Sequence, residues 1–171
     1  NSLLDKATRE AVTIHIAYGR KHRMPWGISE SAFGDLDINK TYQYKAFGVP
    51  KLGLKRGLEE EVVVAPYAAL LAVNIAPKET VQNLRQLARL GLLNDYGYYE
   101  AMDFSRQPSR AGERGVIVRA YMTNHQGMSF LSLTNFIHGN SIQRRFHADA
   151  RVRAAEPLLH ERIPVLPPLH H

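Results

Sequence analysis

The 171-residue sequence contains no cysteine, which excludes disulfide bonds, thiolate metal sites and a cysteine nucleophile. It also lacks an apolar run of about eighteen residues, the length that a membrane-spanning helix requires. The amino-terminal residues carry charges throughout, so they do not have the pattern of a secretory signal. From these absences we expect the segment itself to be soluble.

Low-complexity sequence is missing as well. Hydrophobic residues make up 44% and charged residues 22% of the chain, which is close to ordinary globular usage. The net charge of +6 would permit a nucleic-acid partner, but the basic residues are dispersed and no nucleic-acid-binding motif accompanies them. The densest basic group, at 20–23, is explained by the dipole of a helix that ends there. We therefore expect a folded segment of one-domain size without a nucleic-acid partner.

Helical spacing of apolar residues predicts several helices separated by long polar and aromatic loops. Asp5 is expected to cap the first helix, Pro77 to open a later one that Gly91 ends, and Pro157 to break the last. The two central helices should pack as a hairpin. The predicted helical stretches are 5–23, 62–75, 77–91, 116–137 and 149–161. The stretch 116–137 is expected to form one or two helical segments.

The first candidate for chemistry is the sequence WGISESAF at 26–33, where Glu30 lies among hydroxyl residues close to Trp26. Aromatic surface beside a carboxyl desolvates its charged form, as a general acid requires, and it also offers a face on which a sugar can stack. The plainer interpretation is that Trp26 anchors the core and Glu30 caps a turn. Both interpretations stay open at this point.

The second candidate is YYEAMDF at 98–104, in which Glu100 is flanked by aromatic residues and followed by Asp103. Glycosidic chemistry uses two carboxyl groups, separated by about 5 to 5.5 Å in retaining enzymes and about 6.5 to 9.5 Å in inverting ones. The sequence does not give the distance between the carboxyl groups of Glu30 and Glu100. The alternative that Tyr98 and Tyr99 are simply packing residues stays open.

Two further segments contain candidate binding residues. The polar cluster at 119–129 interrupts an apolar stretch and offers Arg119, His125 and Gln126 as binders of hydroxyl groups. We expect no metal there, because His125 has no second histidine or acid at helical spacing, and a satisfied structural histidine is the alternative. The aromatic, glycine-containing stretch at 42–57 lacks a phosphate-binding pattern, so we expect it to line a cleft. Glu61 follows it and is a candidate for pointing inward.

These segments together resemble the cyclic β-1,2-glucan synthase family, and within it the central glucoamylase-like domain. The resemblance rests on sequence words that follow one another along nearly the whole chain: WGISESAF, YQYKAFGVPKLGLKRGL, VVAPYA, YYEAMDF, NHQGMS and RFHADARVRAAEPLLHERIP. It implies a mostly α fold, the carboxyl-terminal part of an (α/α)6 toroid, with 1–171 forming a single fragment of that domain. The amino-terminal helices of the toroid are expected to be absent.

The resemblance further implies an enzyme, without a cofactor, that acts on linear β-1,2-glucan and closes it into a ring by transglycosylation. The remaining domains of the full-length synthase would be its partners, and the bacterial inner membrane its location. Glu30 is expected as acid/base and Glu100 as nucleophile. The expected substrate-binding residues are Trp26, Tyr42, Tyr44, Glu61, Tyr99, Asp103, Arg119, His125 and Gln126.

Two alternatives belong to another class: a non-catalytic module that binds β-glucan, and a scaffold that only orients the glycosyltransferase. If half of a toroid is missing, apolar helix faces are uncovered, and large exposed apolar patches favour association. We therefore also expect the isolated segment to self-associate or to be only marginally stable.

Overall fold

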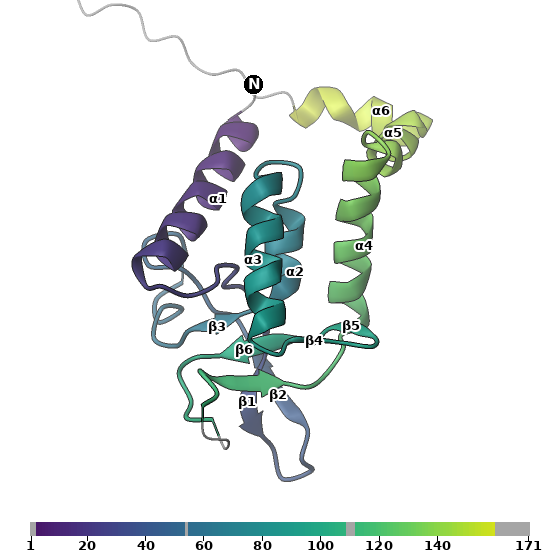
Figure 1. Cartoon of the computed structure of the whole chain (residues 1–171). Coiled ribbons are helices and arrows are strands. Elements are labelled where there is room, and N and C mark those ends of the chain that lie inside the picture. The colour runs from purple at the N-terminus through teal and green to yellow at the C-terminus, as the bar shows by residue number, and fades with distance from the viewer. Residues whose placement is uncertain (1–2, 54, 109–111, 160–171) are drawn as a thin grey trace, which may run out of the picture.

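The computed structural model describes residues 3–53, 55–108 and 112–159. Four helices lie side by side above a set of short strands (Figure 1). These helices are α1 (Leu3–Lys21), α2 (Pro66–Leu71), α3 (Pro77–Arg89) and α4 (Thr123–Ile137). Two further helices, α5 (Ser141–Ala148) and α6 (Ala150–Ala155), follow α4 and are succeeded by a 3-10 turn at Glu156–Leu159. The prediction of a mostly helical chain is confirmed.

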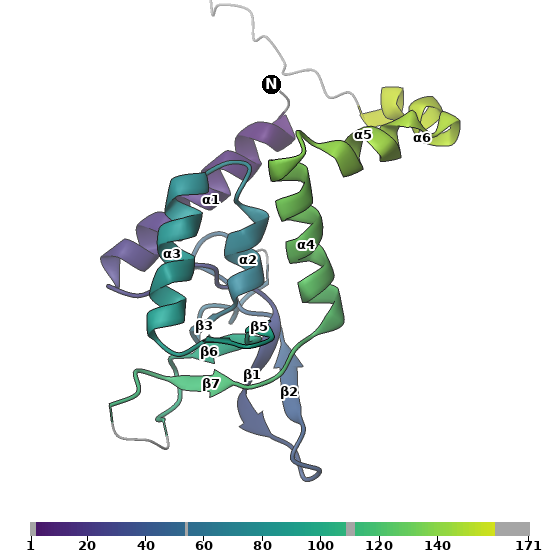
Figure 2. The ribbon, with the colours of Figure 1, turned by 45° about the vertical axis from the view of Figure 1, so that its right-hand side comes forward.

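Three small antiparallel sheets lie below the helices, as the turned view shows (Figure 2). The central sheet has the order β3-β6-β7, formed by Val63–Val64, Ala101–Asp103 and Val116–Val118. A hairpin joins β1 (Ser31–Leu36) to β2 (Tyr42–Lys45), and a second one joins β4 (Leu93–Asn94) to β5 (Gly97–Tyr98). In the central sheet Val63 pairs with Asp103 and Ala101 with Val118.

The predicted helix boundaries are confirmed at several positions. Pro77 opens α3, and Gly91 follows its end with a φ of 90°, a conformation that favours glycine. The helices α2 and α3 contact each other, as expected for a hairpin. Asp149 caps α6 by accepting from Arg151 N–H, and the α-helix gives way to a 3-10 turn that contains Pro157. Residues 160 and 161 of the predicted last helix lie outside the described residues.

Other parts of the helix prediction were wrong. The first helix begins at Leu3, so Asp5 lies in its first turn and does not cap it. The residues Val63–Val64 and Val116–Val118 form strands instead of helix. Both are short valine-rich runs that are largely buried, and such runs do not reveal from their periodicity whether they are helix or strand. The loop expected between the first two helical stretches contains the β1–β2 hairpin.

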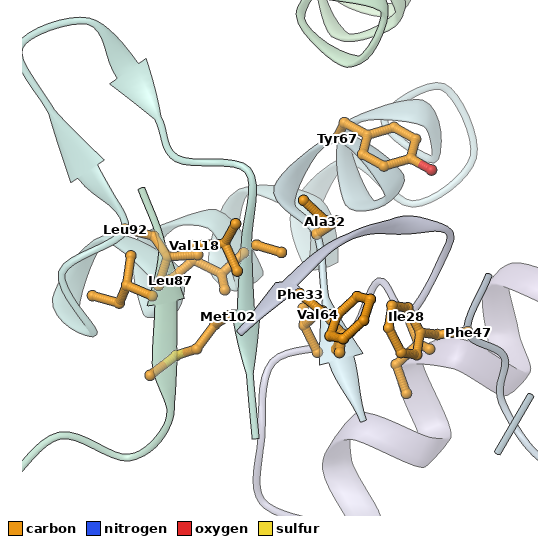
Figure 3. Close-up of a cluster of buried hydrophobic side chains, with 14 of the residues drawn as sticks. Ile28, Ala32, Phe33, Phe47, Val64, Tyr67, Leu87, Leu92, Met102 and Val118 are labelled. Atoms are coloured by element: carbon orange, nitrogen blue, oxygen red, sulfur yellow. The ribbon is translucent and has the colours of Figure 1, made fainter. Parts of the chain in front are cut away.

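The main hydrophobic core lies between the sheets and the lower ends of the helices. Val63, Val64, Leu87 and Leu92 are completely buried in it. Figure 3 shows this cluster, with Ile28, Phe33 and Phe47 on one side and Leu87, Leu92 and Val118 on the other. A second, smaller cluster is formed by Ile16, Trp26, Ala69 and Ala72.

Trp26 belongs to this second cluster because two contacts fix its position. The side-chain amide of Asn83 on α3 accepts from Trp26 N–H at 2.9 Å and donates to Trp26 C=O at 2.8 Å. A Cβ atom on Gly19 of α1 would lie 2.9 Å from Trp26 Cβ, so glycine lets α1 approach the tryptophan. These contacts join α1 and α3 to the segment that leads into β1. Among the described residues, no helix is both long and apolar enough to cross a membrane.

We predict that Asn83→Ala lowers the free energy of unfolding by about 2 to 3 kcal/mol, because it leaves two buried backbone groups of Trp26 unsatisfied. Urea unfolding of the 171-residue chain followed by tryptophan fluorescence measures this effect. Arg85→Ala, an exposed substitution on the same helix, is the control and should change stability by less than about 0.5 kcal/mol. Equal stability of the two variants would contradict the prediction.

Candidate active site

Four of the predicted site residues meet in one hydrogen-bonded cluster, although they lie far apart in the sequence. Glu100 directly precedes β6 and is only 2% exposed. Its carboxylate oxygens lie 2.9 Å and 3.1 Å from Nδ1 of His125, in the first turn of α4. On its other side, Nε2 of His125 lies 3.4 Å from the hydroxyl of Tyr44 on β2. Glu30 is the neighbour of Tyr44 across the β1–β2 hairpin, because Ala32, two residues after Glu30, pairs with Tyr44. Burial and the charge of the Glu30 carboxyl group raise the pKa of the Tyr44 hydroxyl. We call Glu30, Tyr44, His125 and Glu100 the carboxyl chain.

Tyr67 on α2 holds this chain in place, and sequence reasoning did not single it out. Its ring stacks on that of His125 with a centroid distance of 3.7 Å and an angle of 13° between the planes. Its hydroxyl lies 2.9 Å from Ser29 Oγ and donates to Glu30 C=O at 3.0 Å. One side chain therefore fixes both the imidazole ring and the backbone of Glu30. The word VVAPYA contains Tyr67 and was the available signal.

The two predicted catalytic residues differ in their access to solvent. Glu30 is exposed, whereas Glu100 is enclosed by Ala32 N–H, at 3.3 Å, and by the His125 ring. A small cavity beside Glu100 has a volume of about 30 Å³ and is also lined by Tyr99 and Gln126. That volume suits a water molecule and is too small for a sugar. Glu30 is not among the residues that line this cavity.

A second polar cluster lies below the core and centres on Arg106, which sequence reasoning also missed. The Arg106 guanidinium donates to Asp103 at 2.7 Å, to Asp35 at 2.7 Å and to Glu61 at 2.8 Å. Glu61 also pairs with Lys45. Asp103 is completely buried and accepts Gly34 N–H at 2.9 Å, so its oxygens have no open face. The i, i+3 spacing of Asp103 and Arg106 was the only signal for this cluster in the sequence.

The Arg106 cluster ties the β1–β2 hairpin to the central sheet. Asp35 belongs to β1, Lys45 to β2 and Asp103 to β6. Arg106 also lies over the ring of Phe33, with its guanidinium carbon 4.7 Å from the ring centre. This arrangement orients the hairpin that contributes Tyr44 to the carboxyl chain.

The remaining predicted residues lie around these two clusters. Tyr42 accepts Arg119 N–H at 3.4 Å, and the Arg119 side chain is exposed at 3.8 Å from Glu113. Gln126 is exposed and donates to Tyr98 C=O at 3.2 Å. Trp26 is buried in the second core cluster.

Tyr99 belongs to a surface group of aromatic rings. Its ring centre is 5.4 Å from that of Tyr121, which in turn lies 6.5 Å from Tyr96. Tyr96 and Tyr121 are 84% and 40% exposed, so ring faces are open to a ligand here. The hydroxyl of Tyr121 also donates to the side-chain oxygen of Asn94. Exposed aromatic rings beside an amide form the kind of surface on which sugars stack.

Larger hollows lie along α1 and away from the carboxyl chain. One of about 520 Å³ lies between α1 and α3 and is lined by Arg20, Arg23 and Arg89 among others. Another of about 560 Å³ lies between α1 and the segment that opens α3. No group of three or more metal-ligating side chains occurs among the residues that the structure describes.

The helices and short sheets thus enclose a carboxylate–histidine pair, and comparison with known proteins identifies the class of chain to which this arrangement belongs. A family model described as "Putative glucoamylase" matches residues 2–150, and the chain belongs to this family. This places it in the context of carbohydrate-active enzymes.

Among individual proteins, the chain is 43% identical over 162 residues to the cyclic beta-(1,2)-glucan synthase NdvB of Rhizobium meliloti (strain 1021). The match covers 95% of this chain and 6% of that protein, so the chain spans a small part of the relative's length.

Three solved structures share the fold at low sequence identity. One is described as a "putative glucoamylase" from Bacteroides fragilis NCTC 9343, with a TM-score of 0.53 and 22% identity; the match covers 78% of this chain and 27% of that one. Another "putative glucoamylase", from Bacteroides caccae ATCC 43185, has a TM-score of 0.60 and 20% identity; the match covers 88% of this chain and 34% of that one. The third is an endo-beta-1,2-glucanase from Chitinophaga pinensis, in complex with sophorotriose and glucose, with a TM-score of 0.54 and 19% identity. The match covers 88% of this chain and 32% of that one. The expected resemblance to the glucan synthase family is confirmed. The likeness is also consistent with part of an (α/α)6 toroid.

The Arg106 cluster makes stability depend on pH. The hydrogen bond from Arg106 lowers the pKa of Asp35, and hydrogen bonds from Lys45 and from Arg106 lower the pKa of Glu61. A carboxyl group whose pKa is lowered by folding stabilises the protein above its unfolded pKa, and this contribution is lost as pH falls through the folded value. Stability should therefore decrease on acidification from about pH 5 downward.

We predict that Arg106→Gln lowers the free energy of unfolding at pH 7 by about 3 kcal/mol, because buried Asp103 loses its charged partner. It should also flatten the acid-dependent loss of stability, since Asp35 and Glu61 lose their common partner. Urea unfolding at pH 7 and at lower pH measures both effects, with Arg85→Gln as the exposed control. An unchanged pH dependence in Arg106→Gln would contradict this interpretation.

Proposed function

We propose that the chain is part of a cyclic β-1,2-glucan synthase whose glucoamylase-like domain acts on linear β-1,2-glucan and cyclises it by transglycosylation. The observation that carries the proposal is the carboxyl chain, in which two acids from separate sequence words lie on either side of the hydrogen-bonded pair Tyr44 and His125. The similarity to a β-1,2-glucan synthase and the shared fold with an endo-β-1,2-glucanase support the substrate class.

The proposed reaction exchanges one β-linkage for another, which calls for retention through a glycosyl-enzyme intermediate. Glu30 donates a proton to the glycosidic oxygen while the Glu100 carboxylate forms a bond to the anomeric carbon and the leaving sugar departs. In the second half, a hydroxyl of the glucan loses its proton to Glu30, attacks the anomeric carbon and releases Glu100. The exposed position of Glu30 suits the exchange of protons with substrate.

Among the predicted substrate-binding residues, we propose direct sugar contacts for those with open surface. These are Tyr42, Tyr44, Tyr99, Arg119 and Gln126. For the enclosed residues Trp26, Asp103 and His125, together with salt-bridged Glu61, we propose that they hold these contacts in place.

We propose that the whole segment, 1–171, belongs to a single (α/α)6 domain and that its partners are the remaining domains of the synthase. By the same similarity, we propose that the full-length protein is located at the bacterial inner membrane.

One observation favours a second candidate, a non-catalytic module that binds β-glucan. Glu100 is enclosed, and the cavity beside it, about 30 Å³, cannot admit a sugar. The exposed rings of Tyr96, Tyr99 and Tyr121 could bind glucan without any reaction at Glu100. This candidate predicts saturable binding without turnover.

We predict that Glu30→Gln and Glu100→Gln each lower transglycosylation by at least about 10³-fold in the complete protein, because each removes one of the two reacting carboxyl groups. Mass spectrometry of the products from linear β-1,2-glucan measures the loss. Glu10→Gln, a change of the same type at an exposed position of α1, is the control. Full activity in both variants would exclude the assignment, whereas glucan binding without turnover in the wild type would favour the binding module.

We also propose that the isolated segment self-associates through α4 and α5. Large apolar side chains on these helices are exposed: Phe130 (68%), Leu131 (45%), Phe136 (45%), Ile137 (68%) and Phe146 (62%). Apolar surface of this extent favours association, because burial removes it from water.

We predict that the wild-type segment sediments as an oligomer and that the double substitution Phe130→Ser and Ile137→Ser shifts it toward the monomer. Analytical ultracentrifugation over a range of concentrations measures the shift. Lys78→Ser, an exposed change on α3, should leave the association unchanged. A monomeric wild-type segment with a cooperative thermal transition would rule out self-association.

A further inference from the structure

We propose that the Tyr44 hydroxyl serves Glu30 in both of its protonation states, with His125 as its alternative partner, and that Tyr44 is thereby a positioning residue for the acid/base. The inference rests on the proposed function, because it assigns Tyr44 a part in the same reaction. It starts from the position of the Tyr44 hydroxyl, which lies 3.4 Å from Nε2 of His125. Glu30 lies beside Tyr44, because Ala32, two residues after Glu30, pairs with Tyr44 across the β1–β2 hairpin.

The donors and acceptors along the carboxyl chain are limited by their chemistry. Ala32 N–H can only donate, so Oε1 of Glu100 acts as an acceptor. Nδ1 of His125 faces both oxygens of the same carboxylate, at 2.9 Å and 3.1 Å, which suits an N–H donor. A neutral imidazole that donates from Nδ1 has an acceptor at Nε2. His125 therefore presents an acceptor to Tyr44.

The single proton of the Tyr44 hydroxyl then has two possible acceptors. When Glu30 is protonated, its O–H can donate to the Tyr44 oxygen while Tyr44 donates to Nε2 of His125. When Glu30 has given its proton to the leaving sugar, the Tyr44 O–H can turn and donate to the new carboxylate. Rotation of the Tyr44 hydroxyl about its C–O bond thus gives Glu30 a hydrogen-bond partner both when it is an acid and when it is a base. Tyr44 itself transfers no net proton.

The surroundings keep the two partners of Tyr44 fixed and its own proton in place. Tyr67 stacks on His125 and also binds the carbonyl of Glu30, so both partners are held by one side chain. Burial and the nearby Glu30 carboxylate raise the pKa of Tyr44 to about 12, which keeps the phenol protonated at neutral pH. Tyr44 is nevertheless partly open to solvent, at 42% exposure, so substrate can reach the Glu30 side of the chain.

The test uses the complete protein, the variants Tyr44→Phe and Glu30→Gln, and two substrates. One substrate is linear β-1,2-glucan, whose leaving sugar needs a proton. The other is a β-1,2-linked disaccharide with a dinitrophenol leaving group, which departs without one. The measured quantity is kcat/KM, which reports the steps up to the glycosyl-enzyme. Tyr18→Phe on α1 is the matched control.

With the glucan, we expect Tyr44→Phe to lower kcat/KM about 10- to 100-fold, because the acid loses a hydrogen-bond partner. With the dinitrophenyl substrate, the loss should shrink to within about threefold, and Glu30→Gln should show the same selective recovery. Tyr18→Phe should match the wild type on both substrates.

Equal losses on both substrates in Tyr44→Phe, or no loss on either, would overturn the role of Tyr44. That result is distinguishable from failure of the proposed function, which would appear as full activity of Glu30→Gln on the glucan. Selective recovery in Glu30→Gln but not in Tyr44→Phe would leave Glu30 as the acid and reject Tyr44 as its positioning residue.

Discussion

A carboxylate can be retained inside a protein only where hydrogen-bond donors surround it, and Glu100 meets this condition by drawing on separate parts of the chain. Its donors come from the backbone at Ala32 in β1 and from the ring of His125 in α4. The position of the β1 hairpin relative to α4 is therefore coupled to one buried ionisable group. Removing either donor would leave Glu100 under-satisfied, so the geometry of the candidate site and the packing around it depend on the same bonds.

The Arg106 cluster performs a comparable task on the other side of the central sheet. A planar guanidinium group with several donors can bind three carboxylates at once, which a lysine ammonium could not do with the same geometry. Arg106 uses this capacity to join Asp35 of the hairpin, Glu61 before β3 and Asp103 of β6. Two glutamates that the sequence analysis named as site candidates thus have different surroundings: Glu61 is neutralised by nearby cations, whereas Glu100 is bound by a neutral amide and an imidazole.

The helices are buried near the sheets and more exposed at their outer ends. Near the sheets they bury Leu87, Tyr67 and His125 against the core, whereas the outer part of α4 and α5 exposes apolar side chains. Such surface is unusual for a chain that is complete in itself, and it agrees with a chain that spans 6% of the length of its relative NdvB. The buried part of the site therefore lies against the core, and the candidate association surface lies where large apolar side chains are exposed.

The sequence alone was sufficient for α1 and α3, because 3.6-residue spacing is a local property that both display clearly. In α3, proline and glycine also mark the ends. It was also sufficient for the family, since the sequence words around Glu30, Glu100 and His125 follow one another in order.

The tertiary structure alone decided what Val63 and Val116 become, because a short run of valines fits a buried strand as well as a helix until its neighbours are known. It alone decided that Glu30 is open and Glu100 enclosed, and that Tyr67 and Arg106 matter at all. Those properties arise from contacts between residues tens of positions apart, and neither local spacing nor composition contains them.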